Sequence, residues 1–151
     1  GLQMFALATG LQGGYFAVVF VHLIFVLPYL FLSLSDPWRA LDPRYAQVSA
    51  GLGQSPNRFF WNVRLPLLTR AILTALAVGF SVSIGQYLTT LLVGAGRLPT
   101  VTTEAVALAS GGNRRVVGVY AFLQMILPLI GFVIAATIPA ILFRNRRELK
   151  I

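Results

Sequence analysis

The residues that could do chemistry in this chain are polar side chains within long apolar stretches. Gly79, Ser83, Gln86 and Thr90 are spaced four, three and four residues apart, so on one helix they would form a single stripe. Small residues and amides at this spacing let two helices approach and hydrogen-bond across their contact. Helix packing is therefore the favoured interpretation of the stripe. A translocation path for a solute, lined by the same residues, is the alternative.

His22 is the only histidine, and it lies within the first apolar stretch. An ionisable group at membrane depth is a candidate for proton transfer or ligand binding. None of the three apolar stretches contains an acidic residue that could partner it. We therefore expect a neutral histidine that is hydrogen-bonded in a contact between helices.

Several activities are excluded by the residues that the sequence lacks. A phosphate-binding loop of the form G-x-x-x-x-G-K-[ST] needs a lysine, and the only lysine is Lys150, beside the last residue. An intramembrane protease needs an acid or base paired with its nucleophile, a zincin needs two histidines, and a thiolate metal site needs cysteine, of which there is none. We expect no catalytic residue, no metal and no cofactor. If the chain moves a solute, the energy must come from another protein.

Three stretches without Asp, Glu, Lys or Arg must position these residues. They are Tyr15 to Leu34, Ala71 to Gly96 and Val116 to Phe143. Each reaches the roughly 20 residues that a helix needs to cross a bilayer. Hydrophobic residues make up 57% of the chain and charged residues 11%, and no stretch has the charged face of a soluble surface helix. The sequence predicts an all-α integral membrane protein with three transmembrane helices.

The 151 residues are predicted to form one partial transmembrane domain. Its spans are expected at about residues 15–34, 67–94 and 116–143. They are joined by a loop at 35–66 and a second loop at 95–115, and a tail follows at 144–151. The second loop contains LPTVTTEAVALAS, which is typical of a short helix lying along the membrane face.

Basic residues predict the orientation in the membrane. Nine of the twelve Lys and Arg residues lie between the first two apolar stretches or in the tail, and three lie in the loop at 95–115. By the positive-inside rule, the first loop and the C-terminus are cytoplasmic and the N-terminus is outside. The net charge of +8 is then explained by contact with anionic lipid, without nucleic acid.

The first loop contains the start and stop signals of a short helix. Asp42 followed by Pro43 is typical of a helix start, and Gly51 and Gly53 are typical of a stop. A helix over about Pro43 to Leu52 is predicted. Gly53 would form the turn after it, because glycine adopts positive φ angles without a Cβ penalty.

Ser55 and Pro56 repeat the start signal, and a second short helix is predicted to run to about Arg64. Leu65-Pro66 is expected to end it before the next span. Its aromatic residues Phe59, Phe60 and Trp61 lie beside arginines, which is typical of a helix resting on lipid headgroups. A docking surface for a cytoplasmic protein is the alternative.

The run from Gln47 to Pro66, QVSAGLGQSPNRFFWNVRLP, resembles the cytoplasmic EAA loop of permease subunits in bacterial binding-protein-dependent ABC importers. That loop reads E-A-A, three residues, G, nine residues, a β-branched residue, one more residue and L-P. Gly53, Val63 and Leu65-Pro66 stand at the matching positions, and Ser55-Pro56 matches a frequent A-S-P. Gln47-Val48-Ser49 departs from the family by replacing the E-A-A itself.

Two further segments resemble the same family. Ser83 to Tyr87, SIGQY, is similar to S-[IL]-G-[ED]-F in the span after the loop, with Gln86 in place of the acid. Arg97 to Thr100 is similar to an outer T-L-P segment. The order of spans corresponds to the C-terminal half of a permease, so we expect a fragment or a half of a longer protein. The resemblance is closest to the branch for iron, thiamine, sulfate and polyamines.

The resemblance implies a bacterial inner (plasma) membrane permease that works by alternating access, with cytoplasmic ABC ATPase subunits, a periplasmic or extracellular solute-binding protein and a second permease half or subunit as partners. The loop's first helix would sit in a cleft of the ATPase. The implied coupling residues are Gln47, Ser49, Gly53, Ser55, Pro56, Phe59, Val63, Leu65 and Pro66. A small scaffold or assembly protein that does not transport, and an inactive permease remnant, are the alternatives.

Overall fold

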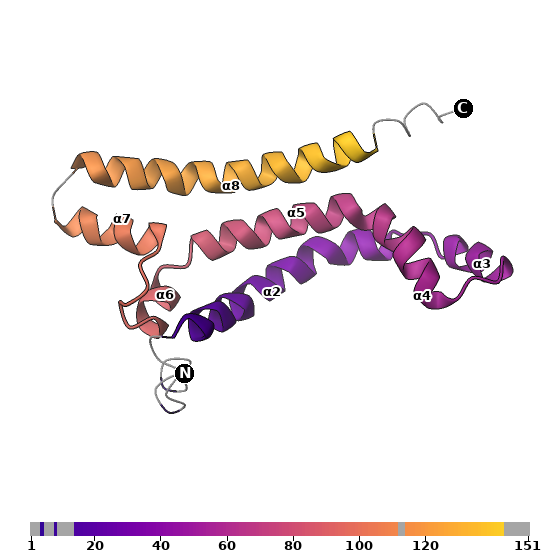
Figure 1. Ribbon diagram of the computed structural model, residues 1–151, viewed down its shortest axis with the longest axis horizontal. Coiled ribbons are helices and arrows are strands. Elements are labelled where there is room, and N and C mark those ends of the chain that lie inside the picture. The colour runs from indigo at the N-terminus through magenta and orange to yellow at the C-terminus, as the bar shows by residue number, and fades with distance from the viewer. Residues whose placement is uncertain (1–3, 5–7, 9–13, 112–113, 144–151) are drawn as a thin grey trace.

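The computed structural model describes Met4, Ala8, residues 14–111 and residues 114–143. Every secondary-structure element in this part of the chain is a helix (Figure 1). The elements in chain order are α2 (Tyr15–Arg39), α3 (Arg44–Gly51), α4 (Pro56–Phe59), the π-helix η1 (Phe60–Arg64), α5 (Leu65–Ile84), α6 (Leu88–Val93), α7 (Val101–Ser110) and α8 (Arg114–Leu142). The all-α prediction is confirmed for the described residues.

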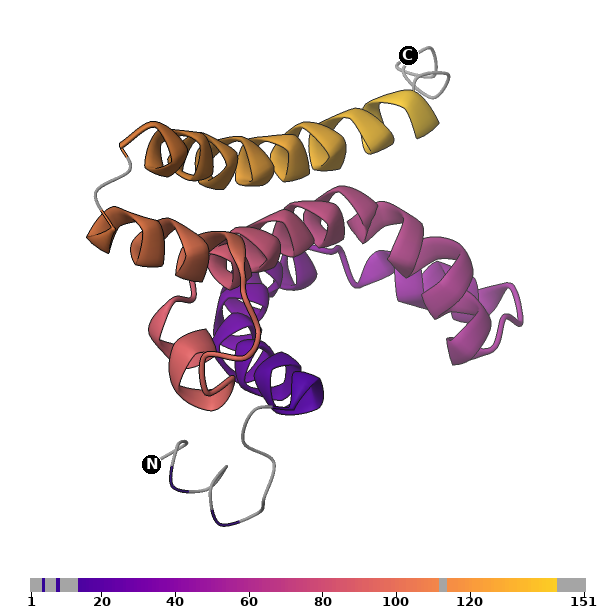
Figure 2. The same cartoon turned by 60° about the vertical axis from the view of Figure 1, so that its left-hand side comes forward.

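Three helices are long and apolar enough to cross a membrane. They cover Tyr15–Arg39, Pro56–Ile84 and Arg115–Leu142, with 25, 29 and 28 residues. Helix α5 lies between α2 and α8 in both views of the ribbon, and its contacts with these two helices are the most extensive in the structure (Figures 1 and 2). The prediction of three transmembrane helices is confirmed.

The second span ends earlier than the sequence predicted. The expected helix reached residue 94, but α5 ends at Ile84 and the chain turns at Gly85 before the short helix α6 begins at Leu88. Helix α6 then folds back along the N-terminal part of α2 (Figure 2). The apolar composition of residues 88–93 is compatible both with a continued span and with a separate short helix. Hydropathy alone therefore did not reveal the break.

The start of the same span also differs from the prediction. Leu65-Pro66 was expected to end a short helix, yet one unbroken helix runs from Pro56 to Ile84. The turn directly before Leu65 is π-helical. A π turn is wider than an α turn, so it leaves room for the Pro66 ring beside the preceding carbonyls, and the missing amide of proline is tolerated.

This helix is longer than the hydrocarbon core of a bilayer. At 1.5 Å per residue, 29 residues span about 43 Å, against about 30 Å of hydrocarbon. For a helix close to the bilayer normal, about 13 Å, or roughly nine residues, would project beyond the hydrocarbon. The projecting part corresponds to α4 and η1, which continue the span out to the loop that carries α3 (Figure 1).

Small residues allow α2 and α5 to pack closely. A Cβ atom added to Gly79 would lie 2.8 Å from Val26 Cγ1 and 3.0 Å from Leu30 Cδ2, both on α2. Ala75 on α5 is completely buried. Close approach through small residues is typical of helix contacts in membranes. Gly79 is therefore a packing residue between the first two spans.

A short helix does form in the second loop, as α7 (Val101–Ser110), but it runs alongside α8 instead of lying across the ends of the spans as predicted (Figures 1 and 2). The Thr100 side chain accepts a hydrogen bond from the Thr103 amide, and the Thr103 side chain accepts one from the Thr100 amide, which together form a capping box. Helix α7 packs against α8 at the end of the molecule opposite α3 (Figures 1 and 2).

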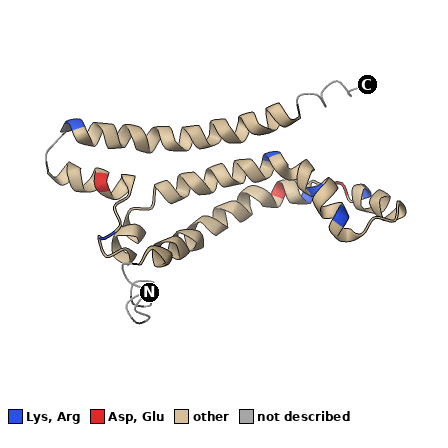
Figure 3. Ribbon diagram, in the orientation of Figure 1, with Lys and Arg blue, Asp and Glu red and all other residues tan. Residues whose placement is uncertain are grey.

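Charged residues gather at one end of the described structure. Figure 3 shows most of the basic segments near α3 and α4, at the end where α8 finishes, and fewer near α6 and α7. The N-terminal end of α2 lies at the opposite end from α3. The basic tail, residues 144–151, lies outside the described residues. The predicted cytoplasmic side thus corresponds to the α3 end, and the orientation itself stays a prediction.

Candidate functional site

The turn between α3 and α4 is held by backbone and side-chain hydrogen bonds. The amides of Gly53 and Gln54 donate to the carbonyls of Ala50 and Ser49, at 2.9 and 3.1 Å. The Ser49 hydroxyl donates to Gln54 Oε1 at 3.1 Å, and Ser49 is buried. Gly53 has a φ of +71°, in the left-handed region that favours glycine. The sequence prediction of a glycine turn at this position is confirmed.

Both short helices start near the predicted signals. The Ser55 hydroxyl accepts a hydrogen bond from the Arg58 amide at 3.4 Å, and Pro56 occupies the first turn of α4. The Asp42 side chain accepts a bond from the Arg44 amide at 2.8 Å, so it caps the start of α3. The two caps fix where the loop enters each helix.

Helix α3 presents an apolar row to its surroundings. Tyr45, Val48 and Leu52 have 50, 63 and 74% of their surface exposed. They lie at spacings of three and four residues, on one face of the helix. Gln47, at the position of the family's glutamate, is also exposed. The surface of α3 is therefore mostly uncharged.

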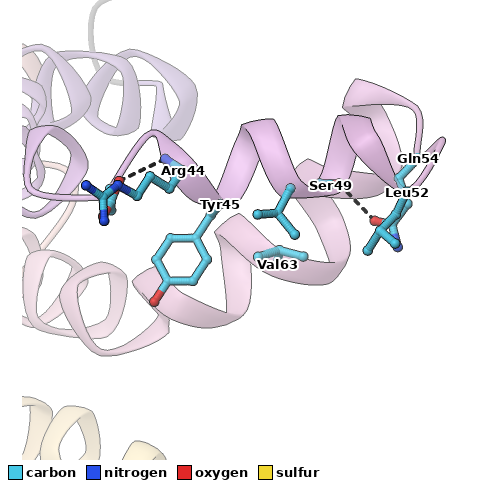
Figure 4. Close-up of a pocket in the computed structure, with 8 residues that line it drawn as sticks. Arg44, Tyr45, Ser49, Leu52, Gln54 and Val63 are labelled. Carbon is cyan, nitrogen blue, oxygen red and sulfur yellow. Dashed lines mark hydrogen bonds between the residues drawn. The ribbon is translucent and has the colours of Figure 1, made fainter.

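A groove of about 450 Å³ lies between α3 and the π turn. Figure 4 shows Tyr45 of α3 pointing toward the helix that carries Val63, and Ser49 joined to Gln54 at the turn, beside Leu52. Its complete lining is Asp42, Arg44, Tyr45, Val48, Ser49, Leu52, Gln54 and Val63. Most of these side chains are uncharged, so the groove suits an apolar or weakly polar side chain of a partner.

An aromatic and cationic joint connects the end of α2 to the π turn. The Arg64 guanidinium carbon lies 3.7 Å from the centre of the Trp38 ring, in a cation–π contact. Phe60 lies between Trp38 and Trp61, with ring centres 6.5 and 5.5 Å away. Trp61 is 59% exposed. The sequence indicated only headgroup contact or docking for these aromatics, and it missed the contact with Trp38.

The other predicted coupling residues occupy two environments. Phe59, Val63, Leu65 and Pro66 are half-buried, because they belong to the helix that continues into α5. Gln47, Gly53, Ser55 and Pro56 are exposed around the turn. The loop thus has an exposed part, α3 with its turn, and a part built into the second span.

Polar side chains meet around His22 at the break between α5 and α6. His22 Nδ1 lies 2.8 Å from Ser83 Oγ, and His22 Nε2 lies 2.8 Å from Thr90 Oγ1. Gln86 Nε2 donates to the His22 carbonyl at 3.4 Å. A single residue of α2 therefore bonds to both sides of the break.

The hydrogen bonds around Thr90 define the roles of the two ring nitrogens in a neutral His22. The Thr90 hydroxyl donates its one hydrogen to the Gln86 carbonyl at 2.6 Å. Its oxygen must then accept from Nε2–H of His22, which leaves Nδ1 to accept from the Ser83 hydroxyl. All polar atoms of this contact are paired, and Thr90 is only 1% exposed.

Helices α7 and α8 complete the polar contacts on the other side of the break. Thr102 Oγ1 donates to the carbonyl of Ile84, the last residue of α5. Gln124 Nε2 of α8 donates to Thr102 Oγ1 at 3.1 Å. Polar groups that a broken helix would expose to lipid are thereby satisfied within the protein. The sequence analysis did not single out Thr102 or Gln124, although each is a polar residue in a largely apolar segment.

The predicted stripe is thus divided between two places. Ser83, Gln86 and Thr90 come together around His22, but on two helices separated by a break. Gly79 packs one turn away against α2. The contacts of His22 are those expected of a hydrogen-bonded packing residue. Among the described residues, no cluster of three His, Cys, Asp or Glu could hold a metal ion.

Comparison with known proteins gives one family. Residues 2–147 match the family described as binding-protein-dependent transport system inner membrane component. Over 138 residues the chain is 44% identical to the inner membrane ABC transporter permease protein YnjC of Escherichia coli K12, covering 91% of this chain and 27% of that protein. No solved structure gave a significant match to the chain.

Other relatives carry different names. A PotC homolog of Mycoplasma genitalium, a spermidine/putrescine transport system permease protein, is 32% identical over 100 residues, covering 66% of this chain and 35% of that protein. ModB of Mycobacterium tuberculosis, a molybdenum transport system permease protein, is 35% identical over 81 residues, covering 54% and 31%. The chain spans about a quarter to a third of the length of these relatives.

Proposed function

Because the chain belongs to the family of binding-protein-dependent transport system inner membrane components, we propose that it forms the part of an ABC importer permease that couples the solute path to a cytoplasmic ATPase. The importer's ATP would be hydrolysed by that ATPase. Coupling would run through residues 47–66, and the path would pass the break between α5 and α6. A second permease half or subunit would complete the membrane domain.

The observation that carries this proposal is the exposed helix α3. It has eight residues, and isolated helices of this length are not stable in water. Its exposed row, Tyr45, Val48 and Leu52, is apolar. A short helix that shows apolar side chains at one end of a membrane protein is best explained by a partner that covers it. The family resemblance of residues 47–66 supports the ATPase as that partner.

The chemistry of the dock follows from the exposed residues. Gln47 replaces the acidic residue of the family, so the contact would rest on apolar burial and neutral hydrogen bonds. Such a contact is less sensitive to salt than an ion pair. The groove beside α3 would receive a side chain of the ATPase between Val48 and Val63.

Solute selectivity would lie mainly with the solute-binding protein. The relatives are named for spermidine/putrescine, molybdenum and sulfate transport. The residues that meet at the break, His22, Ser83, Gln86 and Thr90, include no acid, lysine or arginine that would favour one charge of solute. A path of this kind supports transport of a solute that the binding protein has already selected.

The test is a charge placed on the apolar row. Val48→Asp replaces an exposed apolar side chain with a carboxylate, so this chain should still fold and insert. Burying an unpaired carboxylate against the ATPase costs several kcal/mol, enough to lower its affinity more than 100-fold. Asn57→Asp, exposed on α4 in the same loop, is the matched control.

Co-purification of the ATPase with the membrane-extracted permease measures the outcome, and solute uptake by cells measures its consequence. Loss of the ATPase and of uptake with Val48→Asp, but not with Asn57→Asp, would support the proposal. Full retention of the ATPase with Val48→Asp would refute docking through α3. Retention of uptake without the ATPase would refute the importer function itself.

A further inference from the structure

Helix α6 is held in place by few contacts. It has six residues, Leu88 to Val93, and within the described chain it packs chiefly against α2. The apolar part of that contact consists of Val93 against Ala17, Val18 and Val21, with Leu98 beside them. These are small side chains, so the apolar area that holds α6 is limited.

Hydrogen bonds from His22 supply the rest of the attachment. His22 contacts Ser83 in the last turn of α5 and Thr90 in the middle of α6, both at 2.8 Å. Among the described residues, His22 is the one side chain of α2 that hydrogen-bonds to both of these helices. Removal of the imidazole would leave two hydroxyl groups without that partner and α6 attached to α2 by small apolar residues alone.

Helix α6 is bounded by a turn at each end. The Gly85 amide makes the last helical bond of α5, to the Ser81 carbonyl, and the chain leaves the helix after this residue. On the far side of α6, Gly96 has a φ of +67° and Ala95 a φ of 50°. Short segments bounded by turns of this kind are typical of gating elements.

We propose that His22 is a positioning residue that latches α6 against α2 and so closes the outer end of the solute path in the resting transporter. The proposal rests on the proposed function, which places the path at this break. Opening would require α5 and α6 to move relative to α2, which separates Ser83 and Thr90 from the imidazole. The hydroxyl groups would then face the path, where water or a polar solute can replace the imidazole as their partner.

A conservative variant separates positioning from simple packing. A glutamine amide has one acceptor and one donor about as far apart as the two ring nitrogens of histidine, so His22→Gln can bond both hydroxyls. His22→Leu keeps an apolar side chain but removes both bonds. Thr90→Val removes one of the two bonds to His22, together with the bond from Thr90 to the Gln86 carbonyl, and preserves the shape of the side chain.

The 151 residues contain no cysteine, so a single introduced thiol is the only site in them that a maleimide can label. Val93→Cys places the thiol on α6, where the native side chain is 2% exposed. Leu68→Cys, 3% exposed near the other end of the α2–α5 contact, is the matched control for general loosening. Both are introduced into the complete transporter in native membranes, without ATP. The membranes are permeabilised before labelling with a hydrophilic maleimide, so that the reagent reaches both faces.

We expect His22→Leu to raise the labelling rate of Val93→Cys about tenfold, Thr90→Val about threefold, and His22→Gln by less than twofold, with Leu68→Cys unchanged. An unchanged rate at Val93→Cys in both His22→Leu and Thr90→Val would overturn the proposal, as would an equal rise at Leu68→Cys. If His22→Leu does not accumulate in the membrane, Thr90→Val decides by the same criterion. The labelling needs neither ATPase docking nor uptake, so it can fail while the proposed function holds.

Discussion

Gly53 allows the sharpest test of the turn between α3 and α4, which we call the coupling turn because of its proposed role. A side chain at Gly53 would fit the available space but would strain the backbone. Its φ is +71°, and a Cβ atom added there would meet nothing within 4 Å. Any side chain therefore fits, and only the backbone conformation is penalised. Gly51, two residues earlier, also has nothing within 4 Å, but its φ is not positive. Gly53→Ala and Gly51→Ala thus form a matched pair that differs only in φ.

The magnitude follows from the left-handed conformation. An ordinary L-residue there costs about 1–2 kcal/mol, and a β-branched residue costs more, whereas asparagine is tolerated best. At the end of α3, alanine in place of Gly51 should be neutral or stabilise by up to about 1 kcal/mol. If the ATPase binds only the native turn, its apparent Kd rises as the population of that turn falls. We expect increases on the order of tenfold for Gly53→Ala and larger for Gly53→Val.

The assay is titration of the purified ATPase onto permease reconstituted in nanodiscs, with membrane abundance of each variant measured first. The expected order of apparent Kd is Gly51→Ala at or below wild type, then Gly53→Asn, Gly53→Ala and Gly53→Val. Equal effects of Gly51→Ala and Gly53→Ala would refute the argument from φ. An unchanged Kd for Gly53→Val would show that the turn is not part of the dock.

Two further predictions concern how the spans are joined. Gly79→Leu should force α5 away from α2 and destabilise the purified permease by about 1–3 kcal/mol, seen as a lower Tm in detergent, while Gly118→Leu, with nothing within 4 Å, should leave the Tm unchanged. Trp38→Leu should remove the cation–π contact with Arg64, worth about 0.5–2 kcal/mol, and reduce the stimulation of ATPase activity by the permease. Trp61→Leu is the control, because Trp61 contacts Phe60 and not Arg64, and it should have a smaller effect. Equal effects of the two substitutions would argue against a role for the contact between Trp38 and Arg64.

Features with a local cause could be predicted from the sequence. The three spans follow from length and absence of charge, and both are properties of a single segment. The coupling turn follows from Gly53 and from Ser55-Pro56, whose conformational preferences act within a few residues. His22 was expected to be hydrogen-bonded within the membrane because an unpaired polar group there is costly, and its ring nitrogens are both paired.

Features with a tertiary cause were missed. The break after Ile84 is stabilised by Thr102 of α7 and by His22 of α2, which lie 18 and 62 residues away in the chain, so hydropathy along α5 and α6 could not reveal it. Pro66 was expected to end a helix because proline opposes a regular α-helix. The structure absorbs it in a π turn, and the cation–π contact between Trp38 and Arg64 lies at that same turn.

The continuous helix from Pro56 to Ile84 connects the two candidate sites. One end begins at the coupling turn, and the other ends at the break that His22 bridges. The helix bends at the π turn (Figure 1), but its backbone hydrogen bonds continue through that turn, so a displacement of α4 would be transmitted along α5 toward Ser83. A sharp stop at Pro66 would have placed a flexible joint between the dock and the membrane. With a π turn in place of the predicted stop, a continuous helix would link an ATPase docked at α3, as proposed, to the proposed latch at His22. Variants at Gly53 and at His22 are then expected to act on one transport cycle.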